Sequence, residues 1–222
     1  RLSNGGEVLA VLDTLGQTTD SDSYDDALPS PTAPDGTGPT LALLEPGLDN
    51  SVATNWAPSR ENGGTPGAEN FPPLPPTPAL VINEIHYNPT AGADYEFIEV
   101  YNPGVDPVAL EGFTLVGVEY TFAAGATIDP GEYIVLAANA ANYAGGYDVY
   151  QWTAGELDNA GERIALLDSL NGNQPSDDVT YGVAAPWATE PNGTGPTLAL
   201  GRVGLDNSVA ANWAASWESG GT

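Results

Sequence analysis

Short stretches in which apolar and polar residues alternate follow one another along the chain, and Gly, Pro, Asn or Asp bounds each of them. In residues 95–101 the alternation places Ile98 and Val100 on one face of a strand, with Phe97 and Glu99 on the other. Many short strands at near-regular spacing, without a long helical period, predict an all-β sandwich or barrel. We expect strands at residues 6–13, 39–44, 80–86, 95–101, 113–116, 119–122, 133–138, 163–168, 178–181 and 197–200.

Two local expectations follow from the same pattern. Residues 138–144 and 208–213 are each expected to form a short helical turn. Glu96 and Glu99 lie near strand ends, where carboxylates usually reach solvent, so neither is expected in the core.

The chain contains one module twice. Residues 6–13 parallel 161–168, and a small change of offset predicts a longer turn at 169–176 in the second copy. Such self-similarity usually indicates a tandem array. The segments that recur letter for letter at one shared offset are 36–43 with 193–200, 47–53 with 204–210, and 55–57 with 212–214.

The second copy is preceded by a segment, residues 80–155, that has no counterpart before the first copy. We therefore expect residues 1–65 to be the C-terminal half of a module, 66–78 a proline-rich linker, and 79–222 a complete module. The linker's dense prolines favour an extended, semi-rigid polyproline II segment. The chain is interpreted as part of a longer array of modules. Proteolysis, an artificial chain end and completion of the first module by another chain are the alternative explanations of the incomplete first module.

The charge of the chain restricts its partners. Thirty Asp and Glu residues face four Lys and Arg, for a net charge of -26. Nucleic acids and anionic membrane surfaces need a basic face, so neither is an expected partner. The chain has no cysteine, which excludes disulfides and thiolate metal sites. No stretch is long enough for a transmembrane helix, and the composition favours an extracellular or cell-surface protein.

No catalytic constellation is visible in the sequence. His86 is the only histidine, and Glu84 projects to the same strand face, but a solvent-facing histidine at a strand end is the favoured interpretation. There is no nucleophile elbow, phosphate-binding glycine loop or zinc-ligand spacing. The sequence therefore predicts a protein that is not an enzyme.

Calcium is the one cofactor for which the sequence offers ligands, because hard cations take carboxylate and carbonyl oxygens. Acidic segments at 20–22, 25–26 and 177–178 offer such ligands, as do the repeated pairs Asp49-Asn50 and Asp206-Asn207. The two repeated pairs, each followed by Ser, are the chosen candidates. The same Asp-Asn-Ser pattern suits a turn and a helix N-cap, in which side-chain oxygens accept backbone N–H groups. Capping is the favoured reading and calcium the alternative.

The remaining candidates concern aromatic residues and one sequon. Trp56 and Trp213 follow the Asp-Asn-Ser motif at equal spacing, which predicts a plug at the end of the sandwich. A sugar-binding platform would instead need exposed, coplanar aromatics such as Trp152, Trp187 and Trp217. Asn192 begins an Asn-Gly-Thr glycosylation pattern.

Several segments of the second module occur in the order typical of one domain family. They are VINEI (81–85), YNP (87–89), DYEFIEVYN (94–102), LEGFTL (110–115), YTF (120–122), IDPGEYIVL (128–136) and LDNAGE (157–162). On these residues the chain resembles the lamin-tail domain family, of the bacterial or archaeal extracellular type, with one partial and one complete copy. The resemblance implies immunoglobulin-like β-sandwich repeats without an inter-sheet disulfide, and it carries over no catalytic residues.

These observations predict a non-catalytic structural repeat of an extracellular filament or cell-surface protein. Strands at 6–13 and 39–44 would have uncovered edges unless other polypeptide completes them. The expected partners are therefore copies of the same protein or adjacent repeats, joined by β-sandwich contacts or strand complementation. The alternative is an accessory or calcium-dependent adhesion module of a large secreted multidomain enzyme.

Overall fold

The computed structural model describes residues 1–74, 76–143 and 145–220. Pro75 of the expected linker, Ala144 of an expected helical turn, and Gly221 and Thr222 at the end of the second module lie outside these ranges. The chain divides into two units, unit 1 (Arg1–Leu74) and unit 2 (Pro75–Thr222).

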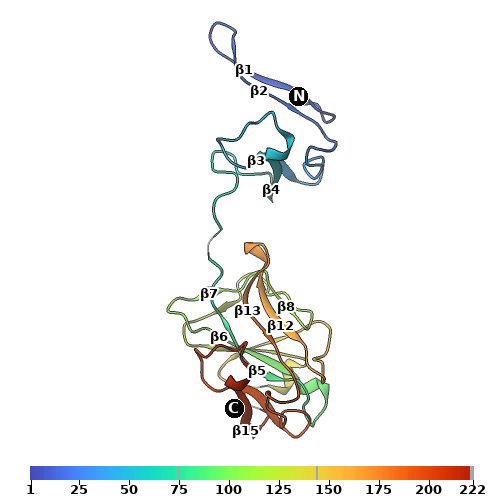
Figure 1. Cartoon of the computed structure of the whole chain (residues 1–222), viewed down its shortest axis with the longest axis vertical. Coiled ribbons are helices and arrows are strands. Elements are labelled where there is room, and N and C mark those ends of the chain that lie inside the picture. The colour runs from blue at the N-terminus through green and yellow to red at the C-terminus, as the bar shows by residue number, and fades with distance from the viewer. Residues whose placement is uncertain (75, 144, 221–222) are drawn as a thin grey trace. The chain divides into compact units, whose positions relative to one another are not determined.

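Unit 2 is a β-sandwich of two main sheets, as the alternation predicted (Figure 1). One sheet has the strand order β11-β10-β6-β5-β14-β15 and the other β13-β12-β8, and β10 and β11 run parallel while the other pairs are antiparallel. A short third pair joins β7 and β9. The strands are β5 (Val81–His86), β6 (Phe97–Tyr101), β7 (Val108–Ala109), β8 (Phe113–Val116), β9 (Thr127–Ile128), β10 (Tyr133–Ala137), β11 (Asp148–Gln151), β12 (Arg163–Asp168), β13 (Gln174–Thr180), β14 (Pro196–Leu200) and β15 (Trp213–Ser219).

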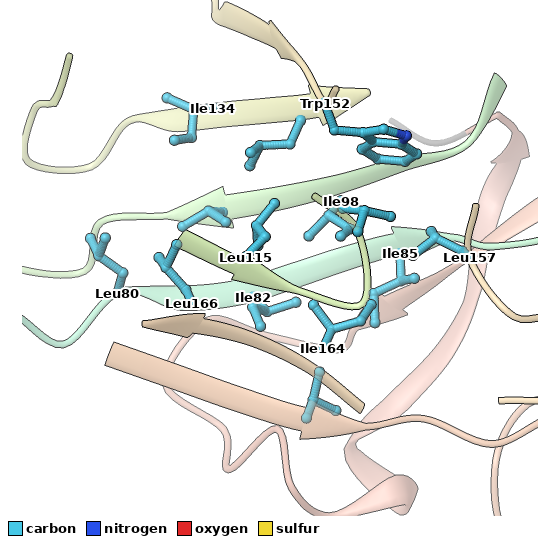
Figure 2. Packing of buried hydrophobic residues seen from close by; sticks show 14 of the residues in the cluster. Leu80, Ile82, Ile85, Ile98, Leu115, Ile134, Trp152, Leu157, Ile164 and Leu166 are labelled. Atoms are coloured by element: carbon cyan, nitrogen blue, oxygen red, sulfur yellow. The ribbon is translucent and has the colours of Figure 1, made fainter. Parts of the chain in front are cut away.

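A single apolar cluster fills the space between these sheets. Figure 2 shows side chains from β5, β6, β8, β10 and β12 gathered in it. Ile82 and Ile98 from the larger sheet and Ile164 and Leu166 from the smaller one are fully buried. Burial of each such side chain stabilises the fold by about 1.5–3 kcal/mol, so unit 2 has a core of its own.

Unit 1 consists of two separate hairpins, β1 (Glu7–Leu12) with β2 (Thr18–Tyr24) and β3 (Pro39–Leu43) with β4 (Trp56–Asn62) (Figure 1). They match β12–β13 and β14–β15 of unit 2 strand for strand. The match extends to irregularities, because β1–β2 and β12–β13 each have a register shift at the same place, after Val11 and after Leu166.

The two copies also share a tyrosine anchor. The Tyr24 hydroxyl donates to the Ser3 carbonyl at 2.7 Å, and the Tyr181 hydroxyl donates to the Asp158 carbonyl at 2.7 Å. These contacts join residues within one half of the module, so the local structure of the half-module is the same in both units.

Most of the expected elements are confirmed and one is wrong. The strands at 113–116 and 163–168 have the expected bounds, and 3-10 turns lie at Ala140–Asn142 and Ala210–Asn212. Residues 119–122 do not form a strand, although they make isolated bridges to β8 and to Ala154. Tyr120 and Phe122 still make backbone hydrogen bonds to β8, but Glu119 bonds to Thr153 and Ala154 instead, so no continuous ladder forms.

Gly161 is required at its position because the Tyr181 backbone approaches it closely. Its φ is +98°, and a Cβ there would lie 2.6 Å from the Tyr181 carbonyl oxygen. We expect Gly161→Ala to lower the free energy of unfolding of unit 2 by about 3 kcal/mol or more. Gly125→Ala is the control, since Gly125 has a φ of +85° with nothing within 4 Å, and backbone strain alone costs about 1–2 kcal/mol. Equal losses in chemical denaturation would show that the close approach contributes nothing.

Candidate functional site

Two strand edges that are paired in unit 2 have no strand beside them in unit 1. In unit 2, β12 pairs with β8 as well as with β13, and β14 pairs with β5 as well as with β15. Within residues 1–74, all of which the structure describes, the equivalent strands β1 and β3 pair only with their hairpin partners. Each therefore has backbone donors and acceptors that can bind another strand, although the Leu43 carbonyl of β3 already accepts a hydrogen bond from Asn70 Nδ2 at 3.0 Å.

The apolar face beside these edges is uncovered as well. Leu9 is 41% exposed and Val11 62% exposed, whereas Ile164 and Leu166, which occupy the same positions of β12, are 0% exposed. The local strand is the same in both copies, so the difference comes from the strands of the front half that cover unit 2. The free edges and this face are the candidate functional site.

The Asp-Asn-Ser motifs form turns in both units. Asp206 Oδ1 accepts from the Ser208 hydroxyl at 2.6 Å and from its N–H at 3.0 Å, and Asp49 makes the same contacts to Ser51. The Ser hydroxyls, with help from the N–H groups, lower the pKa of both carboxyls.

The expected N-cap at this motif is corrected in one respect. The 3-10 turns that follow begin after Val52 and Val209, and these residues make no side-chain cap. The Asp carboxylates instead accept from the N–H groups of Ser51 and Ser208, one residue before Val52 and Val209. Asp49 and Asp206 therefore stabilise the residues just before each 3-10 turn and do not cap its first residue.

The two Asn side chains of the motif bind other parts of their own unit. Asn50 donates to Asp20 at 3.0 and 3.2 Å, and Asn207 donates to Asp177 at 2.5 Å. Among the described residues no group of three or more His, Cys, Asp and Glu side chains is arranged to hold a metal ion. Calcium at Asp49, Asn50, Asp206 and Asn207 stays a prediction. In the same part of the chain no helix is long and apolar enough to cross a membrane.

The tryptophans divide between the core and the surface. Trp213 is buried and its Nε1 donates to the Asn207 carbonyl at 2.7 Å, which confirms the plug in unit 2. Trp56 makes the same bond to Asn50 but is half-buried. Trp152 lies in the core and Trp217 is 99% exposed, so the three other tryptophans share no exposed platform.

Asn192 is exposed in a turn before β14, where its Oδ1 accepts from Asn88 Nδ2 at 2.6 Å. Thr194 of the same sequon donates to the Glu190 carbonyl at 2.6 Å. The side chain of Asn192 thus stands at the surface, and its glycosylation stays a prediction.

His86 is buried, which corrects the expectation of a solvent-facing histidine. It is 4% exposed and packs edge-on against Phe97, with ring centroids 5.5 Å apart. Tyr143, whose hydroxyl donates to the Tyr95 carbonyl, also packs edge-on against Phe97 and so belongs to the cover of this face. Burial lowers the pKa of His86 to about 4, and the nearby Tyr95 backbone offsets part of this effect. Among the described residues, no group lies in hydrogen-bonding geometry to either ring nitrogen.

Two glutamates are also buried in unit 2. Glu84 accepts a hydrogen bond from the Thr197 hydroxyl. Burial raises the pKa of Glu84 to about 7; the hydrogen bond from Thr197 opposes this rise, and the nearby charge of Glu99 adds to it. Glu96 accepts from the Leu157 N–H at 2.8 Å, and burial raises its pKa to about 7. The expectation that Glu96 reaches solvent is wrong, because a segment distant in sequence covers it.

Glu84 and Glu96 bind parts of the fold to one another, whereas half-buried Glu99 lines an open pocket of unit 2 together with Tyr133 and Tyr147. Glu84 joins β5 to β14, Glu96 holds the segment before β12, and half-buried Glu99 accepts from Asn83 at 2.7 Å. Sequence analysis missed them because their partners lie far along the chain. The only local signal was an acid between apolar residues within a strand.

The stability of unit 2 is expected to depend on pH through Glu84. Its pKa rises from 4.5 to about 7 on folding, so the folded state holds a proton that the unfolded state has released, and stability falls as pH rises through this range. Glu84→Gln mimics the protonated acid. We expect it to be more stable than the parent by about 1–3 kcal/mol near pH 8 and little different near pH 5.

Denaturant unfolding of the full chain, followed by tryptophan fluorescence, measures this difference. The opposite contribution of His86 is common to both proteins and cancels. Glu111→Gln, on an exposed carboxylate, is the control that should show no such divergence. If the free energy of unfolding of Glu84→Gln and of its parent changes in the same way with pH, the raised pKa of Glu84 is refuted.

The turn contacts of Asp49 and Asp206 predict that calcium is not needed for stability. We expect the same melting temperature in millimolar calcium and in chelator, because a ligand stabilises the native state only where it binds it. Differential scanning calorimetry of the full chain makes the comparison. A rise with calcium that Asp206→Ala abolishes would instead establish the calcium site.

Comparison with known proteins places this fold in a family. No match to the chain was found among curated proteins. The family described as Lamin Tail Domain matches residues 73–183, half of the 222 residues, and it is a family of non-catalytic, immunoglobulin-like domains. The sandwich of unit 2 and this match agree, and the chain belongs to the lamin tail domain family.

Proposed function

We propose that the chain is a non-catalytic structural repeat of an extracellular filament or cell-surface protein, in which an adjacent repeat or another copy completes the open half-module. The carrying observation is the contrast between Leu9 and Val11, exposed in unit 1, and Ile164 and Leu166, buried at the same positions of unit 2. An exposed strand edge beside an exposed apolar face is a template for strand addition.

Completion by polypeptide outside the half-module joins one module to the next. A head-to-tail contact of this kind repeats from one chain to the next, and it gives a fibre where its rotation does not close a ring. The proline-rich segment at 66–78 suits such a fibre, because polyproline II spaces modules without the freedom of a glycine linker.

The charge of -26 sets the conditions for assembly. Like charges repel at low ionic strength, which keeps chains apart and soluble. Salt screens this repulsion, and the Debye length falls to about 3 Å at about 1 M. Assembly through an apolar edge should therefore strengthen with salt, in contrast to an interface held by ion pairs.

An assembly experiment tests the proposal with the full chain. We expect sedimentation velocity and electron microscopy to show oligomers that grow with protein and salt concentration. The double variant Leu9→Lys with Val11→Lys should remain monomeric, since it places charges on the apolar face. Its loss of assembly cannot come from stronger repulsion, because the two lysines make the chain less negative.

The matched control is Val105→Lys with Leu170→Lys, on two side chains of unit 2 that are 88% and 69% exposed. It changes the charge equally and should assemble as the parent does. A parent chain that stays monomeric under all conditions would overturn the polymer and favour an accessory or adhesion module of a secreted enzyme.

A further inference from the structure

A side-chain pair in unit 2 clamps the backbone of β5. Asp177 Oδ2 accepts from the Ile82 N–H at 2.6 Å, and Asn207 Nδ2 donates to the Ile82 carbonyl at 3.3 Å while it bonds to Asp177. Ile82 is fully buried, so both of its backbone groups need partners. β14 pairs with β5 only at Ile85 and Glu84, and the clamp takes over where this ladder stops.

The same pair exists in unit 1 without a strand. Asp20 lies opposite Val11 in its hairpin, as Asp177 lies opposite Leu166. Asn50 Nδ2 donates to both carboxylate oxygens of Asp20. The pair therefore holds its two hairpins together as its counterpart does, and no backbone of residues 1–74 occupies the position that Ile82 fills in unit 2.

Two neighbouring features of unit 1 fit the same strand. On β3, Leu41 and Ala42 occupy the positions of Leu198 and Ala199, the residues that pair with β5. Leu41 is half-buried and Ala42 is buried, so the proposed pairing uses the backbone of this edge. Thr40 stands where Thr197 donates its hydroxyl to Glu84. An incoming strand would thus find a ladder, a clamp for its backbone and a hydroxyl for one glutamate.

We propose that the Asp20–Asn50 pair and the free edge of β3 form a receptor for a β5-type strand from the front half of another lamin-tail module. The strand runs antiparallel to β3, with its equivalent of Ile85 opposite Leu41 and its equivalent of Glu84 opposite Ala42. The receptor rests on the proposed function and specifies the occupant, its register and its direction.

The test uses the full chain and a fluorescent synthetic peptide, PALVINEIHYN, with the sequence of residues 78–88. Fluorescence anisotropy measures binding, and hydrogen exchange locates it. We expect the peptide to bind and to protect β3 (Pro39–Leu43). A second peptide, N-methylated at the residue equivalent to Ile82, lacks the donor for Asp20 and should bind at least about tenfold more weakly, as expected for a lost hydrogen bond to a charged group.

Protein variants test the other side of the same bond. Asp20→Ala should weaken binding of the unmodified peptide at least about tenfold. The control Glu45→Gln removes one negative charge, as Asp20→Ala does, and should leave peptide binding unchanged. Arg202, which occupies the position of Glu45 in unit 2, is exposed and lies outside β6 and β14, the strands that pair with β5. The N-methyl peptide is measured with the parent chain. It therefore tests the receptor even if the Asp20→Ala variant misfolds.

The outcomes separate the receptor from the proposed function. Binding that is indifferent to both N-methylation and Asp20→Ala, or protection that avoids β3, overturns the receptor. So does the absence of peptide binding under conditions in which the full chain assembles, and in that case the proposed function stands. Failure of the full chain to assemble counts against the proposed function whatever the peptide does.

Discussion

The module depends on the cover that its front half supplies to two hairpins. β8 and β5 pair with β12 and β14, and in doing so they close two backbone edges and bury the apolar face between the sheets. The chain contains its own comparison, because nearly the same hairpins occur once with this cover and once without it. Backbone pairing and apolar burial are lost together in unit 1, since the same strands provide both.

The half-module nevertheless keeps its local form. The tyrosine anchor, the bulge of the first hairpin and the Asp-Asn-Ser turn recur in both units. Each is built from residues close in sequence or joined within one half, and therefore needs nothing from β5 or β8. Under the proposed completion, hairpins that are already ordered would lose less conformational entropy when a strand binds, which favours binding.

The polar groups in unit 2 add specificity to this closure. Glu84, Glu96 and Asp177 each accept a hydrogen bond that crosses between distant segments. Burial of an unpaired carboxylate would cost several kcal/mol, so a strand in the wrong register would leave such groups without partners. The acids thereby penalise incorrect pairings that apolar contacts alone would tolerate.

The amino-acid sequence determined the elements whose causes are local. Alternation located most strands and assigned Ile98 and Val100 to the core face, and turn residues bounded them. It also determined the duplication, since identical segments need no structure to be recognised. Residues 119–122 were assigned a strand because pattern alone does not show that the backbone of Glu119 bonds to Thr153 and Ala154 and so interrupts the pairing with β8.

Only the tertiary structure decided which polar residues are buried and which apolar ones are not. His86 and Glu96 lie at strand ends and were expected in solvent. His86 instead packs against Phe97 of the neighbouring strand, and Glu96 accepts from the N–H of Leu157, which is 61 residues further along the chain. Leu9 and Ile164 have the same local pattern and opposite exposures. Burial is a property of what packs against a strand, and no local pattern encodes that neighbour.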